Sequence, residues 1–150
     1  MKASKEDSSE ILELCALDRE KNSPAEITER PVWERVSVAL TRAYRYGGFV
    51  DLRVVFPSGL VEKLNMTSLP GQYRLTVLTG SDDPKEKLLE WWEEGDSGFR
   101  GVIRFGDDDW DSRTVCSDIS IAENIFKELF ILGDLSSGLL QMRSQWNPKP

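Results

Sequence analysis

The sequence predicts an α+β fold in which a meandering antiparallel β-sheet carries two main helices on one face. Segments 31–46 and 120–132 have apolar residues at helical spacing. Between them, over residues 49–78, apolar and polar residues alternate in three short runs separated by turn-forming residues. Strands joined by such short turns must be antiparallel neighbours, because a parallel connection needs a dozen residues or more. This order of elements favours a sheet with its helices gathered on one face.

The length and charge of the chain limit the kinds of protein it can be. With 150 residues it is long enough for one domain with a hydrophobic core. We expect a flexible segment over residues 1–9 and a single domain over residues 10–150. The net charge of −7 disfavours nucleic-acid binding, because phosphate recognition needs a basic surface. That charge suits a basic partner, or it serves solubility alone.

The N-terminal residues, the lengths of the apolar stretches and the cysteines bear on the cellular location of the protein. Residues 1–7 are charged rather than apolar, so we expect no signal peptide. No apolar stretch approaches the length of about 20 residues that crosses a bilayer. Cys15 and Cys116 form neither a metal-ligand spacing nor a disulfide framework. We therefore expect two free thiols in a cytoplasmic protein that has no membrane contact.

The N-terminal elements follow from local patterns. Residues 11–17 alternate as a strand would, although several of them favour helix, and residues 18–30 look like a charged connector. Pro31 opens the first helix, because a proline at the first helical position loses no hydrogen bond. Gly47 ends that helix. Trp33 lies beside the apolar stripe, where it could cover the sheet edge or a partner. The stripe consists of Val32, Val36, Ala39, Leu40 and Ala43.

The remaining elements follow in order. After Gly48 the apolar period changes to two, which predicts strands over residues 49–56, 60–67 and 73–78. Segment 87–92 is ambiguous, since Pro84 could begin a helix, but its paired tryptophans favour the strand that we adopt. A clearer strand covers residues 99–105. The pair Ser120 and Glu123 forms a capping-box pattern for the second helix, and Gly133 ends it. Residues 134–145 form a short helix or turn. The core face of the second helix consists of Ile121, Ala122, Ile125, Phe126, Leu129 and Phe130.

An acidic segment follows the 99–105 strand, where Gly106 precedes four aspartates and a tryptophan. Such crowded carboxylates repel one another, so we expect a turn that either lies in solvent or meets a cationic partner. Folding alone gives no reason to keep the four aspartates. Tryptophans supply many interfacial hot spots, and carboxylates steer basic partners. Alternatively, at least two of the tryptophans pack in the core. The candidate partner-binding residues are Asp107, Asp108, Asp109, Trp110, Asp111, Trp91 and Trp92, with Trp146 as a further anchor.

Enzymatic chemistry is not expected. The chain has no histidine to activate a nucleophile, and its glycine turns lack a phosphate-binding pattern. We therefore expect no catalytic residues and no cofactor. Calcium binding is an alternative function, because Asp107, Asp109 and Asp111 have the alternate spacing of a calcium loop. However, Ser112 replaces the turn glycine, and Asp118 replaces the usual twelfth-position glutamate, so no metal site is assigned. Glycoside hydrolysis by paired carboxylates is a remote option.

The C-terminal half resembles a known family. The resemblance lies in four features: Phe99-Arg100-Gly101, the run from Phe105 to Asp108 with Trp110, the helix with Phe126 and Gly133, and Trp146. They are similar in layout to the first immunity family of bacterial polymorphic toxin systems, the Imm1-like proteins, over roughly residues 31–146. The resemblance implies a non-enzymatic immunity protein that neutralises a cognate toxin by tight binding. A toxin that acts on nucleic acid presents cationic groups, which an acidic inhibitor can cover. The acidic run and the tryptophan pair correspond to no known toxin contact of that family.

Overall fold

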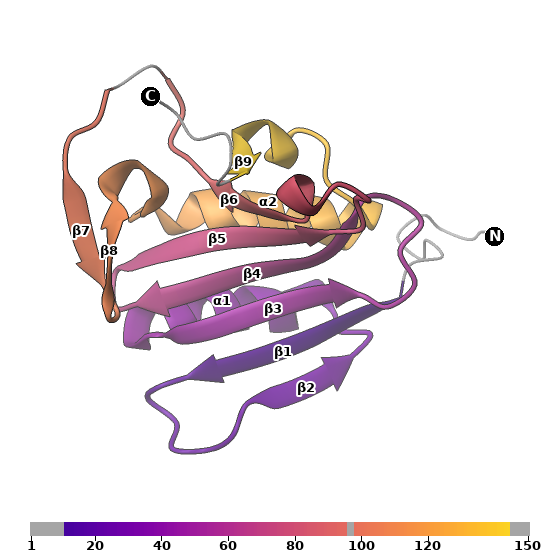
Figure 1. The fold of residues 1–150 in the computed structure, drawn as a ribbon. Helices are drawn as coiled ribbons and strands as arrows, with labels where there is room; N and C mark the ends of the chain where they lie inside the picture. Colours follow the sequence, from indigo (N-terminus) through magenta and orange to yellow (C-terminus); the bar gives the residue numbers. More distant parts are fainter. Residues whose placement is uncertain (1–10, 96–97, 145–150) are drawn as a thin grey trace.

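A computed structural model describes residues 11–95 and 98–144 of the chain (Figure 1). Within them a seven-stranded antiparallel sheet has the order β2-β1-β3-β4-β5-β6-β9, and a separate two-stranded sheet pairs β7 with β8. Helices α1 and α2 both lie behind the large sheet in Figure 1, which confirms the predicted α+β class. The predicted flexible segment 1–9 and Trp146 lie outside the described residues. The strands are β1 (Leu12–Asp18), β2 (Glu26–Glu29), β3 (Gly48–Val54), β4 (Val61–Leu69), β5 (Gln72–Thr79), β6 (Leu88–Trp91), β7 (Val102–Phe105), β8 (Asp108–Asp111) and β9 (Met142–Ser144).

The core lies between the large sheet and the two helices. Alternation along each strand turns every second side chain toward the helices. The strand registers align five of these side chains in one row across the sheet, from β1 to β6. All five are buried. The pattern of period two in the sequence therefore identified the inner face of the sheet correctly. The row consists of Leu14, Leu52, Leu64, Val77 and Leu89.

Helix α1 (Trp33–Tyr46) begins later than the sequence predicts. Its N-cap is Val32, so Pro31 precedes the helix and Val32 is exposed rather than part of the stripe. Gly47 ends the helix with a φ of 87°, as expected from a glycine. The ring of Trp33 packs 5.6 Å from that of Phe130 in α2, which places it between the two helices.

Helix α2 (Ile119–Leu132) has its expected core face but a different N-cap. The side chain of Asp118 accepts a hydrogen bond of 3.0 Å from the Ser120 N–H, so Asp118 takes the position that the pattern gave to Ser120. Since α2 already begins at Ile119, Ser120 lies inside the helix and Asp118 is the residue that caps it. Gly133 ends α2 in the left-handed conformation, with a φ of 74°. Four residues of the expected face, Ala122, Ile125, Phe126 and Leu129, are buried, and Ile121 and Phe130 are partly buried.

Several boundaries differ from the sequence-based prediction. The predicted connector 18–30 contains strand β2, which pairs with β1 although it carries two glutamates. Pairing with a neighbour has overridden the low strand preference of those residues. The adopted strand over 87–92 is confirmed as β6, after a 3₁₀ turn, η2 (Pro84–Glu86). Segment 134–145 contains a short 3₁₀ helix, η4 (Gly138–Gln141), and then the edge strand β9.

The helices, the cysteines and a short 3₁₀ turn complete the description of the fold. Of the helices in residues 11–95 and 98–144, none has the length and apolar character needed to span a membrane. Cys15 is partly exposed and Cys116 is buried, and both are free thiols as expected. A 3₁₀ turn, η3 (Ser112–Thr114), leads from β8 toward α2.

Candidate functional site

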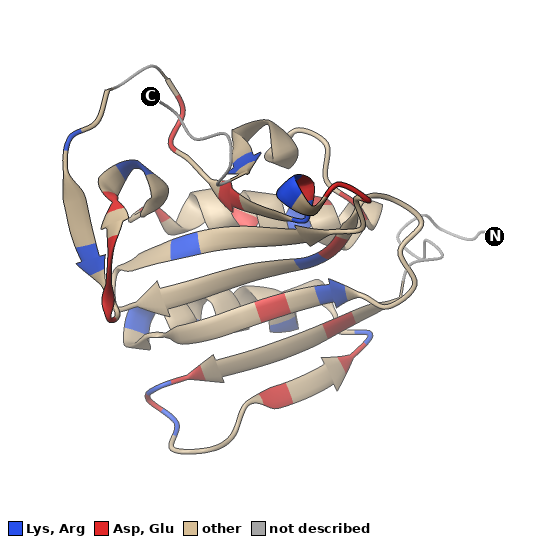
Figure 2. Cartoon of the chain, in the orientation of Figure 1, with Lys and Arg blue, Asp and Glu red and all other residues tan. Residues whose placement is uncertain are grey.

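The acidic segment forms a β-hairpin rather than a simple turn. Strands β7 and β8 pair in register, with Phe105 opposite Asp108 and Arg104 opposite Asp109. Only Gly106 and Asp107 remain for the turn, and the φ of 67° at Gly106 suits a tight two-residue connection. Three of the four aspartates therefore lie on β8. In Figure 2 the Asp residues colour the ribbon of β8 and of the turn at the end of the hairpin red.

The repulsion among these carboxylates is partly relieved by one arginine within the hairpin, Arg104. Arg104 forms an ion pair of 3.2 Å with Asp109, its cross-strand neighbour, and both side chains are more than half exposed. Arg104 also donates a hydrogen bond of 2.7 Å to the main-chain oxygen of Asp107. The side chains of Asp107 and Asp108 are exposed. The tip therefore presents three exposed carboxylates and one arginine.

A first contact fixes the hairpin to the large sheet. Arg74 lies on β5, on the face away from the helices, and its guanidinium carbon is 3.6 Å from the centroid of the Trp110 ring. Arg74 also forms an ion pair with Glu90 of β6. Burial lowers the pKa of Arg74 and raises the pKa of Glu90, and their mutual attraction opposes both shifts. This stack holds β8 against the end of the sheet where β5 begins (Figure 1).

A second contact lies at the base of β8. Asp111 accepts hydrogen bonds from Arg113 at 3.0 Å (Nε to Oδ1), 2.7 Å (Nη2 to Oδ2) and 2.9 Å (main-chain N to Oδ1). Arg113 is only 2% exposed, and its guanidinium lies 5.1 Å from the Trp92 ring centroid. Its hydrogen bonds lower the pKa of Asp111, and the carboxylate in turn raises the pKa of Arg113. Asp111 is therefore part of the buried framework.

The structure separates the predicted site residues into two groups. Asp107, Asp108 and Asp109 are exposed, with Trp110 and Asp111 half-buried beside them. Trp91 and Trp92 are buried, at 4% and 5% exposure. Trp91 faces the core opposite Met142, and Trp92 lies beneath Arg113. The two tryptophans are thus not surface anchors, which fits the alternative that some tryptophans pack inside.

The arginines that hold the hairpin were not found from the sequence. Arg74 lies far along the chain from Trp110, whereas Arg113 lies close to its partner Asp111 in the sequence. Each arginine looks like an ordinary surface residue in its local pattern. A weak signal exists at Arg74, which alternates with buried neighbours on a strand and therefore faces the outer side of the sheet. Only the folded chain shows that β8 covers that position.

The calcium hypothesis rests on side chains that have other partners. Asp109 pairs with Arg104, Asp111 pairs with Arg113, and Asp118 caps α2. In the part of the chain that the structure describes, no three His, Cys, Asp or Glu side chains are grouped so that they could hold a metal ion.

Comparison with known proteins gives a family and a fold. The family of unknown function DUF6911 matches residues 11–139. The crystal structure of a hypothetical protein from Neisseria gonorrhoeae is similar, with a TM-score of 0.61 and 14% sequence identity. The match covers 87% of this chain and 92% of the other, so the two share a fold over nearly their whole lengths. No curated protein matches the sequence.

Proposed function

We propose that the chain, which belongs to the DUF6911 family, is a cytoplasmic immunity-type protein that neutralises a cognate bacterial toxin by binding it. The acidic hairpin would cover a basic, nucleic-acid-acting surface of the toxin. The observation that carries this proposal is the pair of buried arginines, Arg74 and Arg113. They hold β8 in place while three carboxylates of the hairpin, those of Asp107, Asp108 and Asp109, stay exposed. The resemblance to the Imm1-like proteins supports the same function.

The physical advantage of this arrangement is preorganisation. A hairpin already fixed to the sheet loses little conformational freedom when it binds, so less of the interaction energy is spent on ordering it. Exposed carboxylates on Asp107, Asp108 and Asp109 accelerate encounter with a cationic surface. Trp110, which is half-buried, then lies next to the contact as an aromatic anchor.

The proposed activity needs no catalytic group. An inhibitor that occupies the substrate surface of a toxin acts through affinity, so the absence of histidine from the sequence is compatible with it. A net charge of −7 favours a cationic partner and opposes contact with phosphate.

Growth rescue tests the proposal. The proposal predicts that a neighbouring gene encodes a large secreted protein with a C-terminal toxin domain. That domain would be expressed in a heterologous bacterium with and without this chain. We expect the domain to arrest growth, the wild-type chain to restore growth, and the variant Asp107→Asn/Asp108→Asn/Asp109→Asn to restore it less.

A matched control removes the same number of charges elsewhere. Glu34, Asp82 and Glu86 are exposed and lie outside the hairpin. The variant Glu34→Gln/Asp82→Asn/Glu86→Gln should protect as well as the wild type. Arrest that the wild-type chain does not relieve, or a neighbouring gene without a toxin domain, would contradict the immunity function. Equal loss of protection in both variants would show that net charge, and not the hairpin, matters.

A further inference from the structure

Among the described residues, β2 forms an edge strand of the large sheet, on the side away from the acidic hairpin (Figure 1). The Arg30 N–H donates to the Leu12 carbonyl at 2.9 Å, and the β1–β2 register continues this pairing through Thr28 and Glu26. In an antiparallel pair the hydrogen-bonded residues alternate, so the main-chain groups of Ile27 and Glu29 point away from β1. No strand in residues 11–95 and 98–144 pairs with these donors and acceptors, which can therefore bind one further strand.

The outer face of this edge carries unbalanced negative charge. Glu29 lies directly opposite Glu13 of β1, and like charges in that position repel. Glu13 is bound by Arg53 of β3 at 3.2 Å, whereas Glu29 has no ion-pair partner among the described residues. Ile27, next to Glu29 on the same face, is 66% exposed. A cation on an added strand would neutralise Glu29 and cover Ile27 with its alkyl stem.

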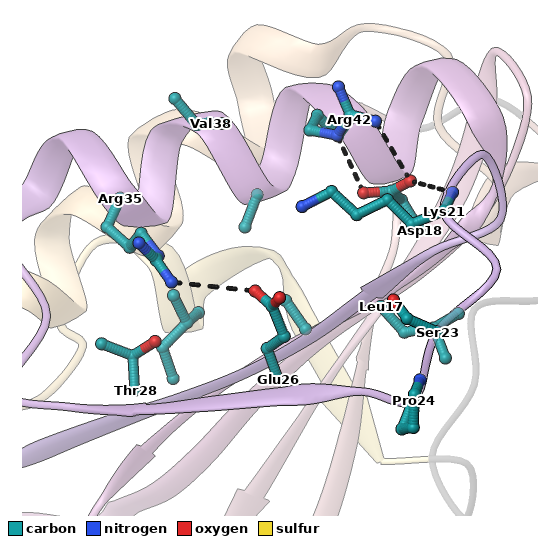
Figure 3. Close-up of a pocket in the computed structure, with 13 residues that line it drawn as sticks. Leu17, Asp18, Lys21, Ser23, Pro24, Glu26, Thr28, Arg35, Val38 and Arg42 are labelled. Carbon is teal, nitrogen blue, oxygen red and sulfur yellow. Dashed lines mark hydrogen bonds and ion pairs between the residues drawn. The ribbon is translucent and has the colours of Figure 1, made fainter.

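The inner face of the same edge borders a cavity. A cavity of about 360 Å³ lies between β2 and α1. The ion pair Arg35–Glu26 (3.7 Å) lies across it, and Arg42 is bound to Asp18 (2.9 Å) nearby (Figure 3). Aliphatic side chains of β1 and α1 line the interior, and Val38 is half exposed at its rim. The aliphatic lining residues are Leu14, Ala16, Leu17, Val38 and Ala39.

We propose that β2 binds an extended segment of a partner protein as an eighth strand, in which cationic and apolar side chains alternate. A residue placed opposite Glu29 points to the outer face, so a lysine or arginine fits there. Its neighbour, opposite Thr28, points to the inner face and brings an apolar side chain to the cavity beside α1. Main-chain hydrogen bonds supply the affinity of such added strands, and side-chain pockets supply the specificity. The inference does not depend on the immunity function.

A second copy of this chain fits the edge less well. If two β2 strands paired antiparallel through their free groups, Glu29 of one would lie opposite Ala25, Ile27 or Glu29 of the other, so neither glutamate would gain a cation. Both Glu13–Glu29 pairs would then lie on one continuous face. Two chains that each carry a charge of −7 also repel each other.

The test uses a synthetic peptide, acetyl-TKVKVKT-amide, and the amide spectrum of the ¹⁵N-labelled full chain. We expect saturable shifts of the Ile27 and Glu29 amides and of resonances around the cavity, with a dissociation constant of about 1 mM or lower. A control peptide with glutamate in place of lysine should cause no such shifts.

Two variants separate strand addition from nonspecific attraction. Ile27→Pro removes an outward N–H that β1 does not use, so the sheet should persist while the peptide shifts disappear. Glu29→Lys should weaken binding by about fivefold, whereas Glu34→Lys, the same charge change on α1, should not. The proposal is overturned if the peptide leaves β2 unperturbed or if the shifts persist in Ile27→Pro. It is equally overturned if β2 amides shift with protein concentration alone, because a second copy would then occupy the edge.

Discussion

Asp111→Asn is predicted to destabilise the protein far more than expected for one aspartate of an acidic surface segment. The side chain accepts three hydrogen bonds from Arg113, whose guanidinium is 2% exposed. Removing one partner of a buried ion pair costs about 3–5 kcal/mol. Asparagine keeps one oxygen, and the Asp111 side chain is 21% exposed, so we expect the free energy of unfolding to fall by about 2–3 kcal/mol.

The measurement is urea-induced unfolding followed by circular dichroism and by tryptophan fluorescence. Asp109→Asn is the matched control, because its ion pair with Arg104 is exposed on both sides, at 54% and 66%. Exposed pairs contribute little, so the control should change the free energy of unfolding by less than about 1 kcal/mol. Equal effects of the two substitutions would refute the assignment of Asp111 to the buried framework.

Three further predictions concern the core, calcium and pH. Phe126→Ala should lower the free energy of unfolding by about 3–5 kcal/mol in the same assay, because Phe126 is fully buried in α2; little change would mean that this helix face is wrongly assigned. Thermal unfolding should give the same midpoint with calcium and with a chelator, whereas a specific site at about 100 times its dissociation constant would add roughly 2.7 kcal/mol. The hydrogen bond from Arg42 lowers the pKa of Asp18 in the folded protein. The ionised Asp18 side chain therefore contributes its full stabilisation of the fold above the unfolded pKa of about 3.9, and this contribution is lost as the pH falls through the folded pKa. Asp18→Asn should therefore be less stable than wild type at neutral pH, and the difference should vanish in acid; a difference that stays constant with pH would contradict this.

The fold could be predicted from the sequence where local patterns carry the information. Alternation of apolar residues placed Leu52 and Val77 on the inner face, and the glycines at 47 and 133 marked the helix ends. Strand β2 was missed because its pairing with β1 comes from tertiary contact and not from the preferences of its glutamates.

The candidate site could be predicted only in part. The aspartate cluster is visible in the sequence, and the structure keeps Asp107, Asp108 and Asp109 exposed. No local pattern separates Asp111 from these three, because its partner Arg113 becomes buried only when η3 and Trp92 pack around it. The expectation that all four aspartates are dispensable for folding is therefore corrected for Asp111.

The most direct test of the central claim is the association rate of the chain with its toxin domain, measured by stopped flow over a range of salt concentrations. We expect a wild-type rate constant above the roughly 10⁵–10⁶ M⁻¹s⁻¹ of unsteered pairs, falling steeply as salt is added. Asp107→Asn/Asp108→Asn/Asp109→Asn should associate about tenfold more slowly, with a weaker salt dependence, while Glu34→Gln/Asp82→Asn/Glu86→Gln should stay close to wild type. If the hairpin variant had the wild-type rate and salt dependence, the hairpin would be a solvated loop and the account of its function would be wrong.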